Sequence, residues 1–153
     1  MIGLSGDKIH YSWADIDQSV LSICSKLTRK PDLVVGIARG GLVPAVMFSH
    51  QLNVPMDTLT WSTRDFKSQR IDQLQALANS GSAVLFVDDL VDSGETFKQI
   101  MEAIALHCPS LQYQVATLIY NIGQDVYSPD YYHDIIDRRT DDRWIVFAYE
   151  REE

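Results

Sequence analysis

Residues 84–96 of this 153-residue chain, VLFVDDLVDSGET, decide its fold. Together with Ala83 they begin as a continuous apolar run through Val87, which is typical of a strand buried on both faces of a parallel sheet. Two acids, Asp88 and Asp89, follow the run, and a helix with apolar residues on one face is predicted to continue to His107. Because open α/β sheets bind ligands at the carboxyl ends of their strands, this stretch is also the first candidate site.

Strands and helices alternate on both sides of this stretch. Ser12 and Asp15 match a capping box at the start of the first helix, and Pro31 lies beyond its end. The alternation predicts an α/β fold with a mostly parallel, twisted sheet flanked by helices, and the lack of a linker predicts one domain over residues 1–153. Helices are expected over residues 12–29, 42–52 and 71–79, and strands over residues 33–38, 56–61, 83–87, 113–120, 131–136 and 144–149.

Two turns carry residues suited to phosphate. In the first, Gly94 allows close approach of the backbone at a helix start, while the hydroxyls of Ser93 and Thr96 can donate to phosphate oxygens. In the second, Arg39-Gly40-Gly41 follows the strand at residues 33–38, and its glycines let backbone amides face an anion. Carboxylates do not bind phosphate directly, so the acid pair before the first turn suits sugar hydroxyls or Mg²⁺.

Residues 84–96 closely resemble the 5-phosphoribosyl-1-pyrophosphate (PRPP) signature of the type I phosphoribosyltransferases. The resemblance implies that fold, with a small hood contributed by the N-terminal and C-terminal segments, and Mg²⁺ as the cofactor. It also implies that Arg39-Gly40-Gly41 is the pyrophosphate loop, with the Arg39–Gly40 bond a candidate for a strained or cis peptide. PRPP would be bound by Arg39, Gly40, Gly41, Asp88, Asp89, Asp92, Ser93, Gly94, Glu95 and Thr96, with Asp89 nearest the metal and Glu95 pointing outward.

A second resemblance indicates which base the protein binds. Residues 144–150, WIVFAYE, are similar to the purine-binding segment of the xanthine-guanine and hypoxanthine phosphoribosyltransferases. That similarity implies that Trp144 stacks on the base, that Ile145 offers its backbone carbonyl and that Glu150 reads the base edge. It further implies that Asp92 is the catalytic residue, accepting the proton on purine N7, and that PRPP and a purine are the substrates.

One position departs from this pattern. The lysine with which the family reads the 6-oxo group falls on Asn121, an amide without charge. A neutral donor in place of a charged one weakens the contact by about 1 kcal/mol or more. The polar segment 62–70 is expected to close as a lid, and Arg64, Lys67 or Arg70 from it could supply the missing charge.

Composition limits the remaining choices. Thirteen basic and 21 acidic residues give a net charge of −8, which argues against binding to nucleic-acid phosphates. Cys24 and Cys108 fit neither a metal pair nor a disulfide framework, so a reducing compartment, the cytoplasm, is predicted. We find neither a run of about 18 apolar residues nor a signal-peptide pattern, so no membrane partner is expected.

Three alternatives stay open at this point. The base could be adenine or a pyrimidine, for which Asn121 is the best support. The protein could instead be a regulatory protein of the same fold that senses PRPP or nucleotides, although a net charge of −8 disfavours contact with nucleic acid. It could also be an interaction domain with a decayed site, against which the intact signature argues. By resemblance, a homodimer or homotetramer is expected.

Overall fold

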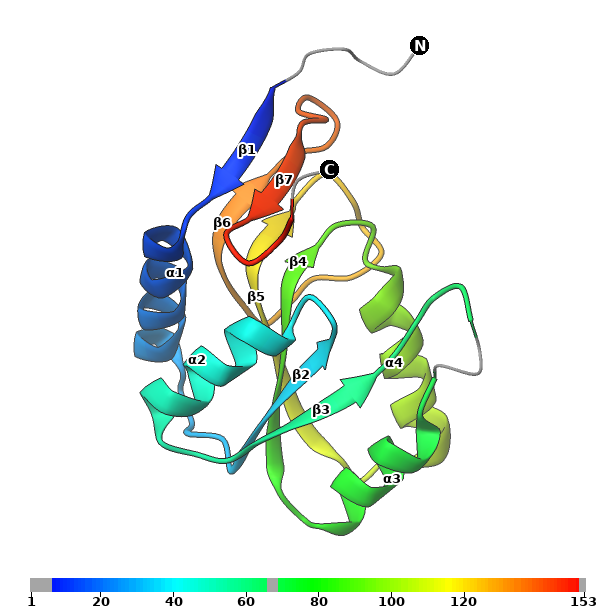
Figure 1. The fold of residues 1–153 in the computed structure, drawn as a ribbon. Helices are drawn as coiled ribbons and strands as arrows, with labels where there is room; N and C mark the ends of the chain where they lie inside the picture. The colour runs from blue at the N-terminus through cyan, green and yellow to red at the C-terminus, as the bar shows by residue number, and fades with distance from the viewer. Residues whose placement is uncertain (1–6, 66–68, 152–153) are drawn as a thin grey trace.

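The computed structural model describes residues 7–65 and 69–151. Within them the chain alternates strands and helices, as predicted (Figure 1). In order, the elements are β1 (Lys8–Tyr11), α1 (Trp13–Lys26), β2 (Leu33–Ala38), α2 (Leu42–Leu52), β3 (Met56–Thr60), α3 (Ile71–Asn79), β4 (Ala83–Val91), α4 (Glu95–His107), β5 (Gln112–Asn121), β6 (Tyr131–Ile136) and β7 (Trp144–Phe147).

Five parallel strands form the main sheet in the order β3-β2-β4-β5-β6. The chain runs outward from β2 to β3 on one side and from β4 to β5 and β6 on the other. Strand order therefore reverses between β2 and β4, and such a switch point opens a ligand crevice at the carboxyl ends of the two strands. The predicted α/β fold with its mostly parallel sheet is confirmed.

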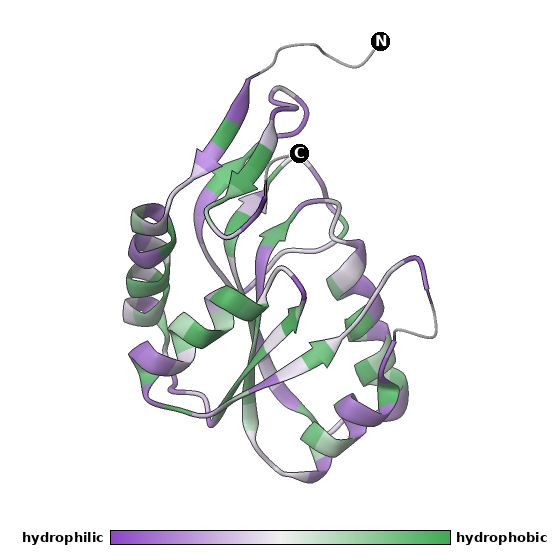
Figure 2. Ribbon diagram, viewed as in Figure 1, coloured by the Kyte–Doolittle hydropathy of each residue, from purple (hydrophilic) through white to green (hydrophobic). Residues whose placement is uncertain are grey.

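Both faces of the sheet are covered, and successive residues of the central strands point to opposite layers. Val34 and Leu85 pack with the buried residues of α1 and α2, whereas Val35 and Phe86 pack with those of α3 and α4. Figure 2 shows helices that carry both polar and apolar residues around strands rich in apolar ones. Burial on both sides explains why these strands appear in the sequence as continuous apolar runs.

Most element boundaries follow local signals. Ser12 and Asp15 form the predicted capping box, with Asp15 N–H donating to Ser12 Oγ at 3.1 Å. Helix α1 ends at Lys26 rather than at residue 29, because Leu27 adopts an extended backbone. Strand β4 was predicted to end at Val87 and instead continues to Val91, since its last residues still pair with β5. The acid pair thus lies within the strand.

A second, two-stranded sheet joins the two ends of the chain. β1 and β7 pair in parallel, with Lys8 opposite Trp144 and Tyr11 opposite Phe147 (Figure 1). β7 lies outside the main sheet and ends at Phe147, two residues earlier than predicted, and β1 was not predicted. Four residues, KIHY, are too few to show a period in the sequence. None of the helices in the described residues is long and apolar enough to cross a membrane.

Two aliphatic residues of α4 provide a matched test of this packing. Ile100 is 1% exposed in the layer between α4 and the sheet, whereas Leu106 is 76% exposed. We expect Ile100→Ala to lower the free energy of unfolding by about 2–5 kcal/mol, through lost burial and a cavity. Leu106→Ala should change it by less than about 0.5 kcal/mol. Urea unfolding of both variants measures the difference, and equal losses would contradict this arrangement.

Candidate functional site

The loop after β2 begins the site at the switch point. Its tight turn is closed by Gly41 N–H donating to Ile37 O at 2.9 Å and by Leu42 N–H donating to Arg39 O at 3.0 Å. The loop contains a cis peptide, but between Ala38 and Arg39, one bond before the predicted Arg39–Gly40 bond. Strand β2 ends at Ala38, and the chain then turns back so that the Gly41 amide reaches the Ile37 carbonyl.

The two glycines allow this loop to lie directly against β4. A Cβ on Gly41 would stand 2.2 Å from the carbonyl oxygen of Val87, and a Cβ on Gly40 would stand 2.5 Å from Asp89 Oδ2. At Gly41 the close atoms are backbone, so that position requires glycine for steric reasons, whereas a side chain at Gly40 would force the Asp89 carboxylate to move. The close approach brings the predicted anion loop and the predicted acid pair into one site.

Asp88 and Asp89 are partly buried beside this loop. Burial and the neighbouring Asp89 carboxylate raise the pKa of Asp88 well above its usual range. Burial also raises the pKa of Asp89, although a hydrogen bond from Tyr149 opposes that shift. The Tyr149 hydroxyl lies 2.9 Å from Asp89 Oδ2 and 3.0 Å from Gly40 O, so it bridges β4 and the loop. Burial makes both carboxyl groups harder to ionise, and a bound cation or a hydroxyl donor would stabilise their charged forms.

The turn after β4 forms a small cradle at the start of α4. Gly94 has a φ of 83°, which favours glycine, and it serves as the N-cap without a side-chain cap bond. The N–H of Glu95, the first residue of α4, lies 3.3 Å from Ser93 Oγ, and the turn borders a cavity of about 110 Å³ at a helix start, the kind of place where anions bind. Glu95 Oε1 lies 4.0 Å from Lys98 Nζ. The cavity is lined by Asp88, Leu90, Val91, Asp92, Ser93, Gly94, Thr96 and Phe97.

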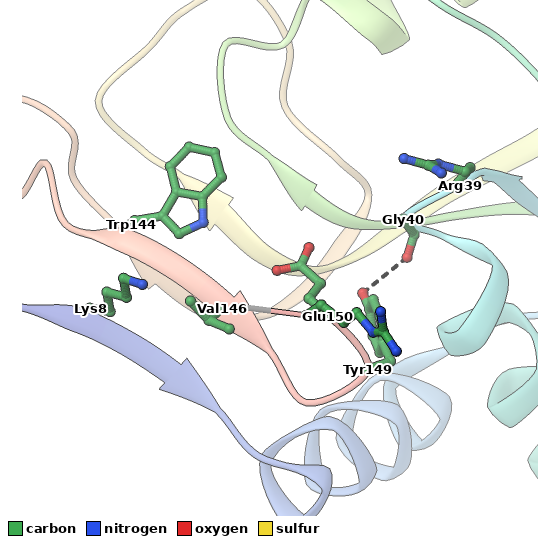
Figure 3. Close-up of a pocket in the computed structure, with 8 residues that line it drawn as sticks. Lys8, Arg39, Gly40, Trp144, Val146, Tyr149 and Glu150 are labelled. Atoms are coloured by element: carbon green, nitrogen blue, oxygen red, sulfur yellow. Dashed lines mark hydrogen bonds between the residues drawn. The ribbon is translucent and has the colours of Figure 1, made fainter. Parts of the chain in front are cut away.

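A larger cavity of about 810 Å³ lies between the β2 loop and the two-stranded sheet (Figure 3). Trp144 and Glu150 come from β7 and the turn after it, and Arg39 faces them from the other side (Figure 3). The Trp144 side chain is 70% exposed, as an open stacking surface would be, whereas the Ile145 side chain is buried in the core. The lining consists of Lys8, Arg39, Gly40, Trp144, Val146, Tyr149, Glu150 and Arg151.

Asn121 and Asp92 are held together at the ends of β5 and β4. Asn121 Nδ2 donates to the backbone oxygen of Asp92 at 3.0 Å and lies 3.3 Å from its Oδ1. Asn121 Oδ1 accepts the backbone N–H groups of Gly123 at 2.9 Å and Arg138 at 3.0 Å. Asp92 Oδ1 also pairs with Arg138 Nε at 3.2 Å. The Asn121 amide, which is predicted to contact the base, thus forms hydrogen bonds with Asp92 and with the backbone N–H groups of Gly123 and Arg138.

Two arginines of the segment predicted as a lid, Arg64 and Arg70, make contacts within their own part of the chain. The Arg70 guanidinium donates from Nε and Nη2 to both carboxylate oxygens of Asp72, at 2.9 and 2.7 Å. Arg64 N–H donates to Ser62 Oγ at 3.2 Å. Neither arginine lines the large or the small cavity. Lys67 lies outside the described residues.

Sequence reasoning missed four residues of the site. Tyr149 appears in the sequence only as the end of a predicted strand, and Lys8 and Arg151 belong to segments without a periodic signal. Arg138 is one of several charged residues in RRTDDR, and nothing local distinguishes it from Arg139. Each joins the site through tertiary contacts between distant segments.

Comparisons with known proteins find one family model and several similar sequences and structures. The phosphoribosyl transferase domain model matches residues 8–153. The chain is similar to the xanthine-guanine phosphoribosyltransferase of Cereibacter sphaeroides, with 34% identity over 137 residues, 77% of this chain and 82% of the relative. The same enzyme of Chromohalobacter salexigens is 31% identical over 108 residues, covering 66% and 67%. The solved purine phosphoribosyltransferase from Pyrococcus horikoshii matches 96% of both chains, with a TM-score of 0.73 and 27% identity.

The raised pKa of Asp88 generates a test of the acid pair. The folded protein retains a proton that the unfolded chain releases near pH 4, so stability falls as pH rises from about 4 through the folded-state pKa. Asn at this position lacks the charge but keeps an oxygen to accept the Asp89 N–H. Asp88→Asn should therefore unfold roughly 2–4 °C higher at neutral pH, and the gain should vanish below about pH 4.

Thermal unfolding of the variant and the unaltered protein at both pH values measures this difference. Asp125→Asn removes an exposed carboxylate and serves as the matched control, with little change expected at either pH. An Asp88→Asn variant that unfolds at a lower temperature at neutral pH would show that the Asp88 charge is not destabilising.

Proposed function

Because the chain belongs to the phosphoribosyl transferase domain family, we propose that it transfers the 5-phosphoribosyl group of PRPP to a 6-oxopurine, releasing pyrophosphate. The observation that carries the proposal is the meeting of three parts at one switch point. These are the anion cradle at α4, the glycine loop after β2 and the aromatic cavity beneath β7. A sugar carrying a phosphate, a diol and a pyrophosphate matches the first two parts, and a planar base matches the third.

Each part of PRPP has a chemically suited partner. The 5′-phosphate binds at the start of α4, where the first amides and the hydroxyls of Ser93 and Thr96 donate to its oxygens. The ribose hydroxyls donate to Asp88 and Asp89. The pyrophosphate is received by Arg39 and the amides of the two glycines after it. The phosphates are thus bound by amides, two hydroxyls and one guanidinium.

The base occupies the large cavity under the pair of strands β1 and β7, which we take as the hood. Trp144 provides a face for stacking, the Ile145 carbonyl accepts from the base, and the Glu150 carboxylate accepts N–H groups at its edge. Glu150 Oε2 accepts the Phe147 N–H at 3.2 Å, which holds the carboxylate over the turn after β7. Asn121 contributes by holding Asp92 in place.

The acid pair also fits the Mg²⁺ that the family is expected to use. Two adjacent carboxylates with raised pKa values repel each other, and a divalent cation relieves that repulsion. Among the described residues, no group of three or more His, Cys, Asp or Glu side chains could hold a metal. One or two carboxylates completed by substrate oxygens suit Mg²⁺, and Asp89 is the nearer to the pyrophosphate loop. When bound, Mg²⁺ would neutralise charge on the leaving pyrophosphate.

The chain's own residues then act on the two reacting partners. A purine nitrogen forms a bond to ribose C1 as the bond from C1 to the pyrophosphate oxygen breaks. Positive charge grows on the sugar beside Asp88 and Asp89, and negative charge grows on the pyrophosphate beside Arg39. Asp92, whose side chain is 46% exposed, accepts the proton released from purine N7.

Three further expectations accompany this proposal. The protein is predicted to act in the cytoplasm, to form a homodimer or homotetramer, and to use residues 1–153 as one domain. The segment 62–70 stays a predicted lid.

The reaction is tested by incubating the protein with PRPP, Mg²⁺ and one base at a time, while pyrophosphate release is followed. We expect release with xanthine, guanine or hypoxanthine and little with adenine or pyrimidines. Release with adenine or a pyrimidine alone would favour the other base choice. Binding of PRPP without release for any base would favour the sensor.

The role of Asp92 is tested by Asp92→Asn, which keeps the shape of the side chain and removes its basic oxygen. We expect turnover to fall about 10²-fold, the usual loss for a general base, with little change in the KM for PRPP. Asp125→Asn, at an exposed acid of the β5–β6 loop, is the control. Unchanged turnover in Asp92→Asn would remove the proton-accepting role from this residue.

A further inference from the structure

Arg138 is a cation that the proposed reaction does not yet use. It lies in the loop between β6 and β7, and its side chain is only 21% exposed. Its Nε lies 3.2 Å and its Nη2 3.5 Å from the two carboxylate oxygens of Asp92. A half-buried guanidinium therefore stands beside the proposed proton acceptor.

Asn121, the residue predicted to donate to the base, has its polar atoms engaged elsewhere. Its Nδ2 contacts Asp92 twice, and its Oδ1 accepts two backbone N–H groups, one of them from Arg138. An amide has only two N–H donors, and both contacts of Asn121 Nδ2 are with Asp92. The position instead fixes the backbone of the loop that carries Arg138.

The donors of Arg138 are only partly used. Nη1 donates to the carbonyl oxygens of Arg143 and Asp141, and Nε donates to Asp92. Among the described residues, Nη2 has one contact, the long one of 3.5 Å to Asp92 Oδ2. Of the five N–H groups of a guanidinium, at least one on Nη2 is thus available to a ligand that approaches Asp92.

The same contacts link Arg138 to Asp92, which is assigned to the base, and to the residue next to Trp144, which is assigned to it as well. On one side it holds Asp92, and on the other it holds the carbonyl of Arg143, the residue directly before Trp144. A base that stacks on Trp144 while N7 faces Asp92 presents its adjacent 6-oxo group on the same edge. Arginine is well suited to that edge, because purine O6 is an acceptor that matches its N–H donors.

We propose that Arg138 reads the 6-oxo group of the purine and supplies the charged donor that Asn121 lacks. The assignment rests on the proposed function, since it needs a purine with N7 at Asp92. Arg138 and Asp92 then form a donor and acceptor pair that matches the 6-oxo group and the N7 proton. A 6-amino group would direct its N–H groups at the N–H groups of Arg138, so the pair also excludes adenine.

The test compares two nucleotides that differ only in the 6-oxo group, inosine 5′-monophosphate and purine riboside 5′-monophosphate. Calorimetric dissociation constants are measured for the unaltered chain, Arg138→Gln and Arg138→Lys. We expect Arg138→Gln to raise the dissociation constant of inosine 5′-monophosphate about tenfold, because one charge-assisted hydrogen bond is lost. The dissociation constant of purine riboside 5′-monophosphate should change less than about twofold. Arg138→Lys should restore part of the preference, because it keeps a charged donor.

Arg139→Gln is the matched control, because Arg139 follows in the same loop but is exposed and pairs with Asp137. It should leave both dissociation constants unchanged. If Arg138→Gln weakened the binding of both nucleotides equally, Arg138 would only position its neighbours, and the assignment would be overturned. An unchanged preference for the inosine nucleotide over the purine riboside nucleotide would overturn it too. If the unaltered chain releases no pyrophosphate with any base, the proposed function fails and the assignment fails with it.

Discussion

The close packing of the β2 loop against β4 is the constraint on which the site depends. At Gly41 the loop backbone approaches the carbonyl of Val87 so closely that a Cβ has no room, and at Gly40 the neighbour is the Asp89 carboxylate. Strand order reverses between these two strands, so their carboxyl ends diverge into a crevice while their backbones touch. Tyr149 fixes the contact from the far end of the chain by bridging Gly40 and Asp89.

This packing explains how an acidic protein can bind a polyanion. The net charge of −8 is distributed over the molecule, whereas the phosphate groups of PRPP would meet backbone amides, a helix start and Arg39. Asp88 and Asp89 are concentrated where hydroxyls and Mg²⁺ are expected. Burial raises the pKa of both carboxyl groups, and a cation bound between them would offset that effect.

The contacts among Asp92, Asn121 and Arg138 connect three segments at the opposite edge of the crevice. The turn after β4 contributes the acid, β5 ends on the amide, and the loop before β7 contributes the guanidinium. Because the Arg138 guanidinium also binds the carbonyl of Arg143, the start of β7 is linked to Asp92, the acid proposed to receive the N7 proton. In the proposed reaction, base recognition and proton acceptance would therefore share one hydrogen-bonded unit.

The sequence by itself determined the layered α/β fold, because strands buried on both faces must be apolar throughout and helices that pack on a sheet must be amphipathic. It also predicted the acid pair and the glycine turn at the start of α4, because the residues of both lie within residues 84–96. It predicted β4 too short, since pairing with β5 extends the strand past its apolar run. Only the tertiary structure brought in Lys8, Tyr149 and Arg138, because each reaches the site from a segment distant in the chain and without a local period. Only the tertiary structure showed that Asn121 forms hydrogen bonds with Asp92 and Arg138, because the choice of hydrogen-bond partner depends on packing as well as on residue type.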